Sequence, residues 1–257
     1  MDPFRSLLLL SSLFSVAAPH SILQISPGSR RHGDRSAWKG DELYCESWRF
    51  SVETNDAGVW KQVPEICVGF VREYMTGERY ASDCAMVSNN SMSFAGGVEI
   101  AGDGKDAWIF DIDETLLSNL PYYAAHGFGS EVFDENAYNE WANLADAPAI
   151  PASLILYNGL KGLGFKLILL TGRTEVQRNA TAKNLLLAGY SNWERLILRG
   201  IDDVGKPALV YKSHKRAELE GEGYRIHGNS GDQWSDLLGM PVATRSFKLP
   251  NPMYYIE

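Results

Sequence analysis

Hydrophobic and polar residues follow two alternating patterns along the second half of the chain. Apolar residues recur at helical spacing in three stretches, 152–163, 174–188 and 211–220. Short apolar runs lie between and after them, at 165–170, 195–198 and 224–226. The longer stretches predict helices and the short runs predict strands. Regular alternation of strands and helices is typical of a parallel sheet covered by helices on both faces, so we expect an α/β fold.

The first half of the chain predicts a helical extension ahead of that sheet. Cys67, Phe70, Val71 and Tyr74 follow the i, i+3, i+4, i+7 spacing of an amphipathic helix, and Gly77 marks its end. A second helical stretch runs from about residue 79 to residue 94. Two helices joined by a tight turn are expected to run antiparallel.

A cluster of acids follows the strand that is expected at residues 108–110. The sequence WIFDIDET places Asp111, Asp113 and Glu114 directly after an apolar run. Uncompensated like charges are costly in a poorly solvated place, so a cation is expected there, most simply a metal ion. This stretch is therefore the predicted chemical centre.

Residues 119–151 form a long, aromatic-rich excursion directly after that strand, with a helix expected over about 134–145. Lids and substrate walls are often built in such a place. The alternative is a surface insertion that packs its own aromatic side chains.

The N-terminal residues predict a targeting segment rather than part of the fold. In residues 1–18, Arg5 precedes an apolar run that is too short to span a membrane and resembles a secretory signal. A frayed N-terminal core helix is the alternative. Residues 19–41 are polar and predict a flexible leader, which leaves 42–257 for the folded domain. We expect a mature protein without a membrane partner, in the extracellular space or the vacuole.

The cysteines and two sequons bear on the same prediction. Cys45, Cys67 and Cys84 are an odd number, so an oxidising compartment would leave one thiol unpaired within the chain. The antiparallel helices would bring Cys67 and Cys84 to similar heights, where a bridge could form, and no spacing suits zinc. The sequons predict glycosylation at Asn89 and Asn179.

Composition and charge restrict the class of partner. The chain has 257 residues, of which 45% are hydrophobic and 22% charged, as in an ordinary globular protein, and its net charge is −8. An acidic surface argues against nucleic acid and anionic membrane as main partners. An anionic substrate would have to be attracted locally, by a metal or by a few placed cations.

Polar residues follow the predicted strands, and parallel strands bring their carboxyl ends to one edge of the sheet. Four segments meet this condition: Asp111 with Asp113, Thr171-Gly172-Arg173, Lys212, and Asp232 with Asp236. The carboxylates suit Mg²⁺ better than a soft metal. A hydroxyl at Thr171 and an ammonium at Lys212 suit an anion. Together these groups fit a phosphoryl group.

Asp111, the first residue after the strand, is the predicted nucleophile toward phosphorus. Asp113 is predicted to protonate the leaving oxygen and then to deprotonate the water that hydrolyses the aspartyl-phosphate. Two residues near these aspartates each have two possible roles. Arg173 is either a structural ion-pair partner or a phosphate ligand, and Asp236 either supports the metal or only caps a helix.

Four segments, in order, resemble the motifs of the haloacid-dehalogenase-like (HAD) phosphohydrolases. They are DIDET at 111–115, LLTGR at 169–173, Lys212 in YKSHKR, and GDQWSD at 231–236. With YCESWR at 44–49 and the ending FKLPNPMYYI, residues from about 40 to 257 resemble the plant acid phosphatases and vegetative storage proteins of class B type. The resemblance implies a Rossmann-like HAD fold with a small cap-like insertion at 119–151.

The resemblance also implies a role for each matched residue. Asp111 would be nucleophile and metal ligand, Asp113 acid/base and ligand through its carbonyl, and Asp232 a ligand of Mg²⁺. Thr171, Gly172 and Lys212 would hold the phosphate, and Asp236 would support the metal.

Two functions are compatible with the resemblance. One is an Mg²⁺-dependent acid phosphatase acting on small phosphate monoesters, and the other is a vegetative storage protein with little or no activity. Loss of the nucleophile would abolish covalent catalysis, and Asp111 is present, so the sequence favours the enzyme. A dehalogenase that attacks carbon is disfavoured, because it needs neither Asp113 nor a metal. The oligomeric state is left open, with a homodimer among the states considered.

Overall fold

The computed structural model describes residues 35–257. The predicted signal, 1–18, and most of the predicted leader lie outside the described residues. The first helix, α1 (Arg35–Glu53), begins inside the stretch 19–41 that was predicted as a leader. Cys45 and Val52 lie two helical turns apart and are both buried. Packing of the later turns therefore stabilises the helix. Extending a helix that is already formed toward Arg35 costs little free energy.

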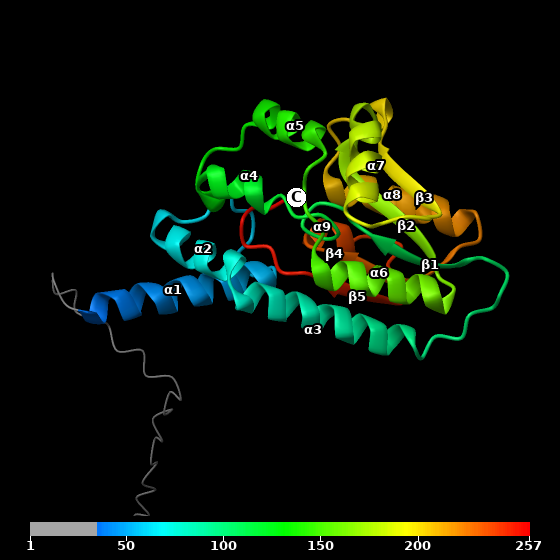
Figure 1. The fold of residues 1–257 in the computed structure, drawn as a ribbon, viewed down its shortest axis with the longest axis horizontal. Helices are drawn as coiled ribbons and strands as arrows, with labels where there is room; N and C mark the ends of the chain where they lie inside the picture. Colours follow the sequence, from blue (N-terminus) through cyan, green and yellow to red (C-terminus); the bar gives the residue numbers. More distant parts are fainter. Residues whose placement is uncertain (1–34) are drawn as a thin grey trace, which may run out of the picture.

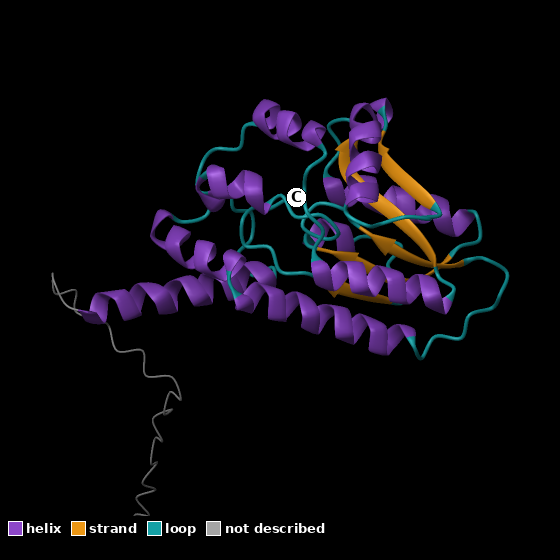
Figure 2. Ribbon diagram, viewed as in Figure 1, coloured by secondary structure: helices purple, strands orange, loops and turns teal. Residues whose placement is uncertain are grey.

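A parallel sheet of five strands forms the centre of the fold, as the alternation predicted (Figures 1 and 2). The strands are β1 (Asp106–Phe110), β2 (Lys166–Thr174), β3 (Arg195–Arg199), β4 (Arg225–Gly231) and β5 (Arg245–Lys248). Their order is β3-β2-β1-β4-β5, so the chain runs outward from β1 on one side and returns to β4 on the other. In such sheets ligands bind at the carboxyl ends of the strands where the order reverses, here between β1 and β4.

Helices cover both faces of the sheet, which confirms the predicted fold class. The covering helices are α3 (Glu78–Ala95), α6 (Pro151–Leu163), α7 (Arg178–Leu187) and α8 (Ala208–Gly221). Trp108 and Phe110 of β1 share one apolar cluster with residues of α3, α6 and α7. Ala107 and Ile109 share another cluster with residues of α8. Successive side chains of a strand point to opposite faces, so a strand that is buried throughout needs apolar cover on both sides.

Strand β4 continues to Gly231, past the end predicted at residue 226. A side chain at Gly228 would lie 2.3 Å from the ring of Trp108, so the indole packs directly on this glycine. The indole N–H also donates to Oγ of Ser230 at 3.0 Å. Glycine, asparagine and serine have low strand propensity, so the sequence pattern predicted a strand that ends too early. In the structure, packing against Trp108 stabilises the longer strand. Strand β5 was not predicted.

The N-terminal helices and the 119–151 insertion pack together in a third apolar cluster. The elements involved, besides α1 and α3, are η1 (Glu65–Cys67), α2 (Val68–Thr76), α4 (Leu120–Ala125), η2 (Gly127–Gly129) and α5 (Glu135–Leu144). Val71 and Tyr74 of α2 belong to this cluster together with Tyr122 and Tyr123 of α4. The helix predicted over 134–145 is present as α5. Three shorter elements complete the described chain: η3 (Glu175–Gln177), η4 (Ile201–Asp203) and α9 (Trp234–Leu237).

The cysteine pairing was left open by the sequence, and the structure decides it. Cys45 on α1 and Cys67 on η1 form a disulfide with Cα atoms 5.3 Å apart, and Cys84 on α3 is free and buried. The bridge between Cys67 and Cys84 that the helical spacing allowed is therefore not formed. Helical spacing related two predicted helices to each other but did not predict α1, which brings Cys45 to Cys67.

No helix within residues 35–257 is both long and apolar enough to cross a membrane. Both sequon asparagines are exposed on helices, Asn89 on α3 and Asn179 on α7. Their side chains are therefore accessible in the folded chain, and glycosylation at either site stays a prediction.

Opening the disulfide with Cys45→Ser should lower the free energy of unfolding by about 3 kcal/mol, because the bridge joins residues 22 apart and restricts the unfolded chain. Urea unfolding of the oxidised protein measures this loss. Cys84→Ser is the matched control, since it keeps the bridge, and should cost about 1 kcal/mol. A linked Cys67–Cys84 peptide in a non-reducing digest would contradict the pairing.

Candidate active site

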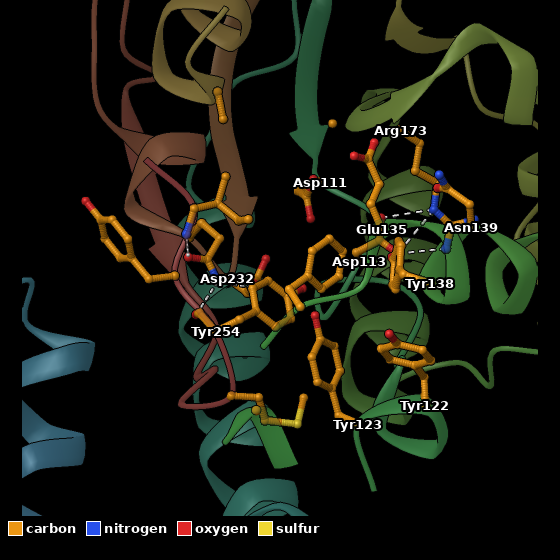
Figure 3. A pocket seen from close by; sticks show the side chains of 18 of the residues that line it. Asp111, Asp113, Tyr122, Tyr123, Glu135, Tyr138, Asn139, Arg173, Asp232 and Tyr254 are labelled. Carbon is orange, nitrogen blue, oxygen red and sulfur yellow. Dashed lines mark hydrogen bonds and ion pairs between the residues drawn. The ribbon is translucent and has the colours of Figure 1, made fainter. Parts of the chain in front are cut away.

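A cavity of about 420 Å³ opens at the carboxyl ends of β1 and β4, where the sheet topology predicts a ligand site. Four acids and a lysine from the predicted motifs line it, and so do aromatic side chains from the 119–151 insertion and from the chain end (Figure 3). Those motif residues are Asp111, Asp113, Lys212, Asp232 and Asp236. The fold therefore brings together residues that lie more than a hundred positions apart.

Asp111 follows β1 directly, and its backbone N–H donates to the carbonyl of Ser230 on β4 at 2.9 Å. The Asp111 carboxylate is buried, and its Oδ1 accepts a hydrogen bond from Nζ of Lys212 at 2.5 Å. Lys212 also donates to Oδ1 of Asp236. Carboxylate oxygens of Asp111, Asp232 and Asp236 lie within 4.8 Å of one another. Lys212 thus lies among three acids, none of which is more than 6% exposed.

The charges of this group do not balance, because three carboxylates surround one ammonium. Burial raises the pKa of Asp232 to about 8, and the charges of Asp236 and Glu114 add to that rise. Burial also raises the pKa of Asp111, although Lys212 opposes the shift. For Lys212, burial acts to lower the pKa, but the charges of Asp111 and Asp236 outweigh it and raise it.

A divalent cation would remove this imbalance, and hard oxygen donors are the ligands that such cations prefer. Two of the three acids keep an oxygen with which to bind it. Oδ2 of Asp111 accepts no hydrogen bond from the described residues, and Oδ1 of Asp232 has one long contact, 3.4 Å from Oγ1 of Thr115. Both oxygens of Asp236 are occupied, by Lys212 and by the backbone N–H of Gln233. The residues present therefore fit a divalent metal ion.

Asp113 is held in a different direction, toward the insertion and β2 (Figure 3). Arg173 binds its carboxylate through two nitrogens, with Nη2 2.7 Å from Oδ1 and Nε 3.0 Å from Oδ2. Asn119 and Tyr138 also donate to Oδ1, at 2.7 and 3.0 Å. Burial acts to raise the pKa of Asp113, but Arg173, Asn119 and Tyr138 outweigh it and lower it. Of the two alternatives for Arg173, its contacts are those of an ion-pair partner.

Thr171 and Gly172 lie where β2 departs from regular pairing with β3. Gly172 lines the cavity. The side chain of Thr171 is fully buried, and its oxygen accepts the backbone N–H of Arg173 at 3.1 Å. Thr171 is absent from the residues that line the cavity, so its contact in this structure is with the turn.

Glu114 was assigned no role from the sequence, yet it is fully buried and has a left-handed backbone with φ of 53°. Its carboxylate accepts the backbone N–H of Asn119 at 2.5 Å and the hydroxyl of Tyr254. Burial, with a smaller contribution from the charge of Asp113, raises the pKa of Glu114 to about 8. Glu114 therefore ties the end of β1 to the insertion and to the last residues of the chain.

Aromatic rings form the wall of the cavity opposite the acids (Figure 3). Tyr123 stacks on Tyr254 with ring centroids 5.0 Å apart, and Tyr122 lies 4.3 Å from the ring of His126. The wall joins the insertion to the chain end. The insertion thus lines the cavity and also packs against the N-terminal helices, so neither of the two expectations for it was complete.

Sequence reasoning missed several residues that contact the acids. They are Asn119, Tyr138, Gln233, Asn251 and Tyr254. The only signal for the last two was the family-like ending FKLPNPMYYI, which carries no periodicity or spacing that indicates a site.

The fold and this cluster define an α/β phosphohydrolase of the HAD type. Residues 34–257 match the family described as HAD superfamily, subfamily IIIB (acid phosphatase), and the chain belongs to that family. HAD enzymes use a divalent metal, which agrees with the unbalanced acids.

Curated relatives include enzymes and storage proteins of plants. Acid phosphatase 1 of Solanum lycopersicum is 54% identical over 84% of this chain and 85% of the relative. The stem 28 kDa glycoprotein of Glycine max is 46% identical over 84% and 85%. Vegetative storage protein 2 of Arabidopsis thaliana is 40% identical over 82% and 80%. These relatives confirm the resemblance stated from the sequence.

A solved structure shares the fold. The class C acid phosphatase from Bacillus anthracis superposes with a TM-score of 0.63 and 23% identity, over 74% of this chain and 86% of that one. At that identity the likeness supports the fold alone.

Lys212→Met should lower the free energy of unfolding by about 3 kcal/mol in the absence of metal, because it leaves the buried carboxylates of Asp111 and Asp236 without their cation. Urea unfolding with a chelator measures it. Lys215→Met is the matched control on the same helix. Lys215 pairs with the exposed Glu218, so its loss should lower the free energy of unfolding by less than about 1 kcal/mol. Equal losses in the two variants would contradict the buried ion-pair role.

Proposed function

We propose that this acid phosphatase family member hydrolyses small phosphate monoesters through an aspartyl-phosphate on Asp111, with Mg²⁺ as cofactor. One observation carries the proposal. Asp111 is placed in the cavity directly after β1, is bonded to Lys212, and shares its surroundings with the buried carboxylate of Asp232. A nucleophile, a cation and a metal-binding acid are the groups that attack on phosphorus requires.

In the first step, a carboxylate oxygen of Asp111 attacks phosphorus and the bond to the leaving oxygen breaks. Lys212 and the backbone of Gly172 bind the phosphoryl oxygens. Asp113 supplies the proton that the leaving oxygen takes up, so it must carry that proton when substrate is bound. Tyr122 and Tyr123 exclude water from the leaving group.

In the second step, water attacks the aspartyl-phosphate and phosphate leaves Asp111. Asp113 takes the proton from that water, and the ion pair with Arg173 favours the carboxylate form that this step requires. Asn119 and Tyr138 hold the carboxylate toward the cavity. When bound, Mg²⁺ would neutralise charge on the nucleophile and the phosphoryl group, held by Asp111, Asp232 and the carbonyl of Asp113, with Asp236 in support.

The alternative is a storage protein with little or no phosphatase activity. The sequence similarity to vegetative storage protein 2 and to the stem 28 kDa glycoprotein supports this alternative. The presence of Asp111, Asp113 and Lys212 in one cavity favours the enzyme.

Asp111→Asn should lower kcat for p-nitrophenyl phosphate by about 10⁴-fold, because an amide cannot form the covalent intermediate. Phosphate release is measured across pH, with Mg²⁺ and with chelator, and removal of the metal should lower activity in the wild type. Asp106→Asn is the matched control on the same strand, since Asp106 pairs with Arg225 outside the cavity and should leave kcat within a few-fold. Wild-type activity no higher than that of the Asp111 variant would favour the storage protein.

We also propose that the chain enters the secretory pathway, with the signal removed after residue 18 or nearby and glycans on Asn89 and Asn179. The exposed positions of both asparagines support the glycans. Expression in a secretory host should give a mature N-terminus near residue 19 and a mass that falls on treatment with a glycosidase. Met1 retained in secreted material would refute the signal, and an unchanged mass would refute the glycans.

A further inference from the structure

The last nine described residues, 249–257, form a strap that leads away from the edge strand β5 (Figure 1, red). Four residues of this strap, 253–256, line the cavity. The strap begins where the N–H of Leu249 donates to the carbonyl of Gly231 at 2.9 Å. It passes so close to the insertion that a side chain at Gly129 would lie 1.8 Å from the carbonyl oxygen of Met253. It also contacts α8, because Ala208 N–H donates to the carbonyl of Glu257 at 2.8 Å.

Two amide side chains connect this strap to Asp232. Nδ2 of Asn251 and Nε2 of Gln233 each lie 2.7 Å from Oδ2 of Asp232. Asn251 is 1% exposed, and its Oδ1 accepts the backbone N–H of Met253 at 2.9 Å, which fixes the direction of the amide. The strap also holds Gln233, since its Oε1 accepts the N–H of Ile256 at 3.0 Å.

These contacts determine which oxygen of Asp232 remains for a cation. Oδ2 is occupied by two donors at short distance, whereas the one contact of Oδ1 within residues 35–257 is the 3.4 Å contact with Thr115. Without the two amides, the Asp232 carboxylate could rotate about its Cβ–Cγ bond. Either of its oxygens could then face the cation. Groups that orient metal ligands in this way commonly change metal affinity by about 10- to 100-fold.

We infer that Asn251 is a positioning residue of the metal site: with Gln233, it fixes the Asp232 carboxylate so that Oδ1 is presented to the cation. The inference rests on the proposed function for the identity of the cation, Mg²⁺. The same strap carries Tyr254, whose ring stacks on Tyr123 in the cavity wall. One segment therefore supports both the metal ligand and the surface that faces the substrate.

Titration calorimetry of the full chain with Mg²⁺ tests the inference without any phosphatase assay. Asn251→Leu, which keeps the size of the side chain and removes its donor, should weaken Mg²⁺ binding by about 10- to 100-fold. Gln233→Met should do so as well, because it removes the other donor to the same oxygen. The Mg²⁺ concentration that half-saturates phosphatase activity should rise by a similar factor in both variants. Ile256→Ala, an exposed change on the same strap, should bind Mg²⁺ as wild type does.

Unfolding in chelator shows whether each variant is folded before Mg²⁺ is added. If Asn251→Leu does not fold, Gln233→Met decides the question. Unchanged Mg²⁺ affinity in the folded variants, an equal loss in Ile256→Ala, or a wild type that binds no Mg²⁺ would each overturn the inference. A wild type that binds Mg²⁺, with affinity lost in Asn251→Leu, but releases no phosphate would refute the proposed function alone.

Discussion

At the end of β1, one lysine and three aspartates occupy a space that is almost closed to water. Lys212 bonds to Asp111 and Asp236, and Asp232 lies against the same group. Like charges this close are tolerated only where cations and hydrogen-bond donors compensate them, so the surrounding chain has to supply both. Helix α8 supplies the lysine and helix α9 supplies Asp236, while Asp111 and Asp232 directly follow strands β1 and β4. A divalent metal would compensate the negative charge that these groups leave.

The second acid of the first motif depends on a different group of donors. The hydrogen-bond partners of Asp113 are not members of the lysine cluster but come from β2, from the start of the insertion and from α5. The two aspartates thus have different electrostatic surroundings although they are two residues apart, and this difference supports the division of roles between nucleophile and acid/base. The insertion contacts this acid as well as forming part of the wall of the cavity, because Asn119 and Tyr138 donate to the Asp113 carboxylate.

Much of the fold followed from local pattern. The alternation of helices and strands from 152 onward predicted the parallel sheet, because burial on both faces leaves continuous apolar runs in the strands. The acids at the ends of β1 and β4 could be assigned to one site because parallel strands place their carboxyl ends together. Helix α1, strand β5 and the end of β4 were missed, since each is stabilised mainly by distant packing, as Trp108 on Gly228 illustrates.

The sequence by itself determined the chemistry that is available: which residues could be nucleophile, acid/base, cation and metal ligand, and which family the chain belongs to. It could do so because those residues lie at or near the ends of parallel strands, and parallel strands bring their carboxyl ends to the same edge of the sheet. Only the tertiary structure decided that Arg173 pairs with Asp113, that Cys45 pairs with Cys67, and that Asn251 reaches Asp232. These pairings join segments with no common periodicity, so their geometry exists only once the helices, the insertion and the strap have packed.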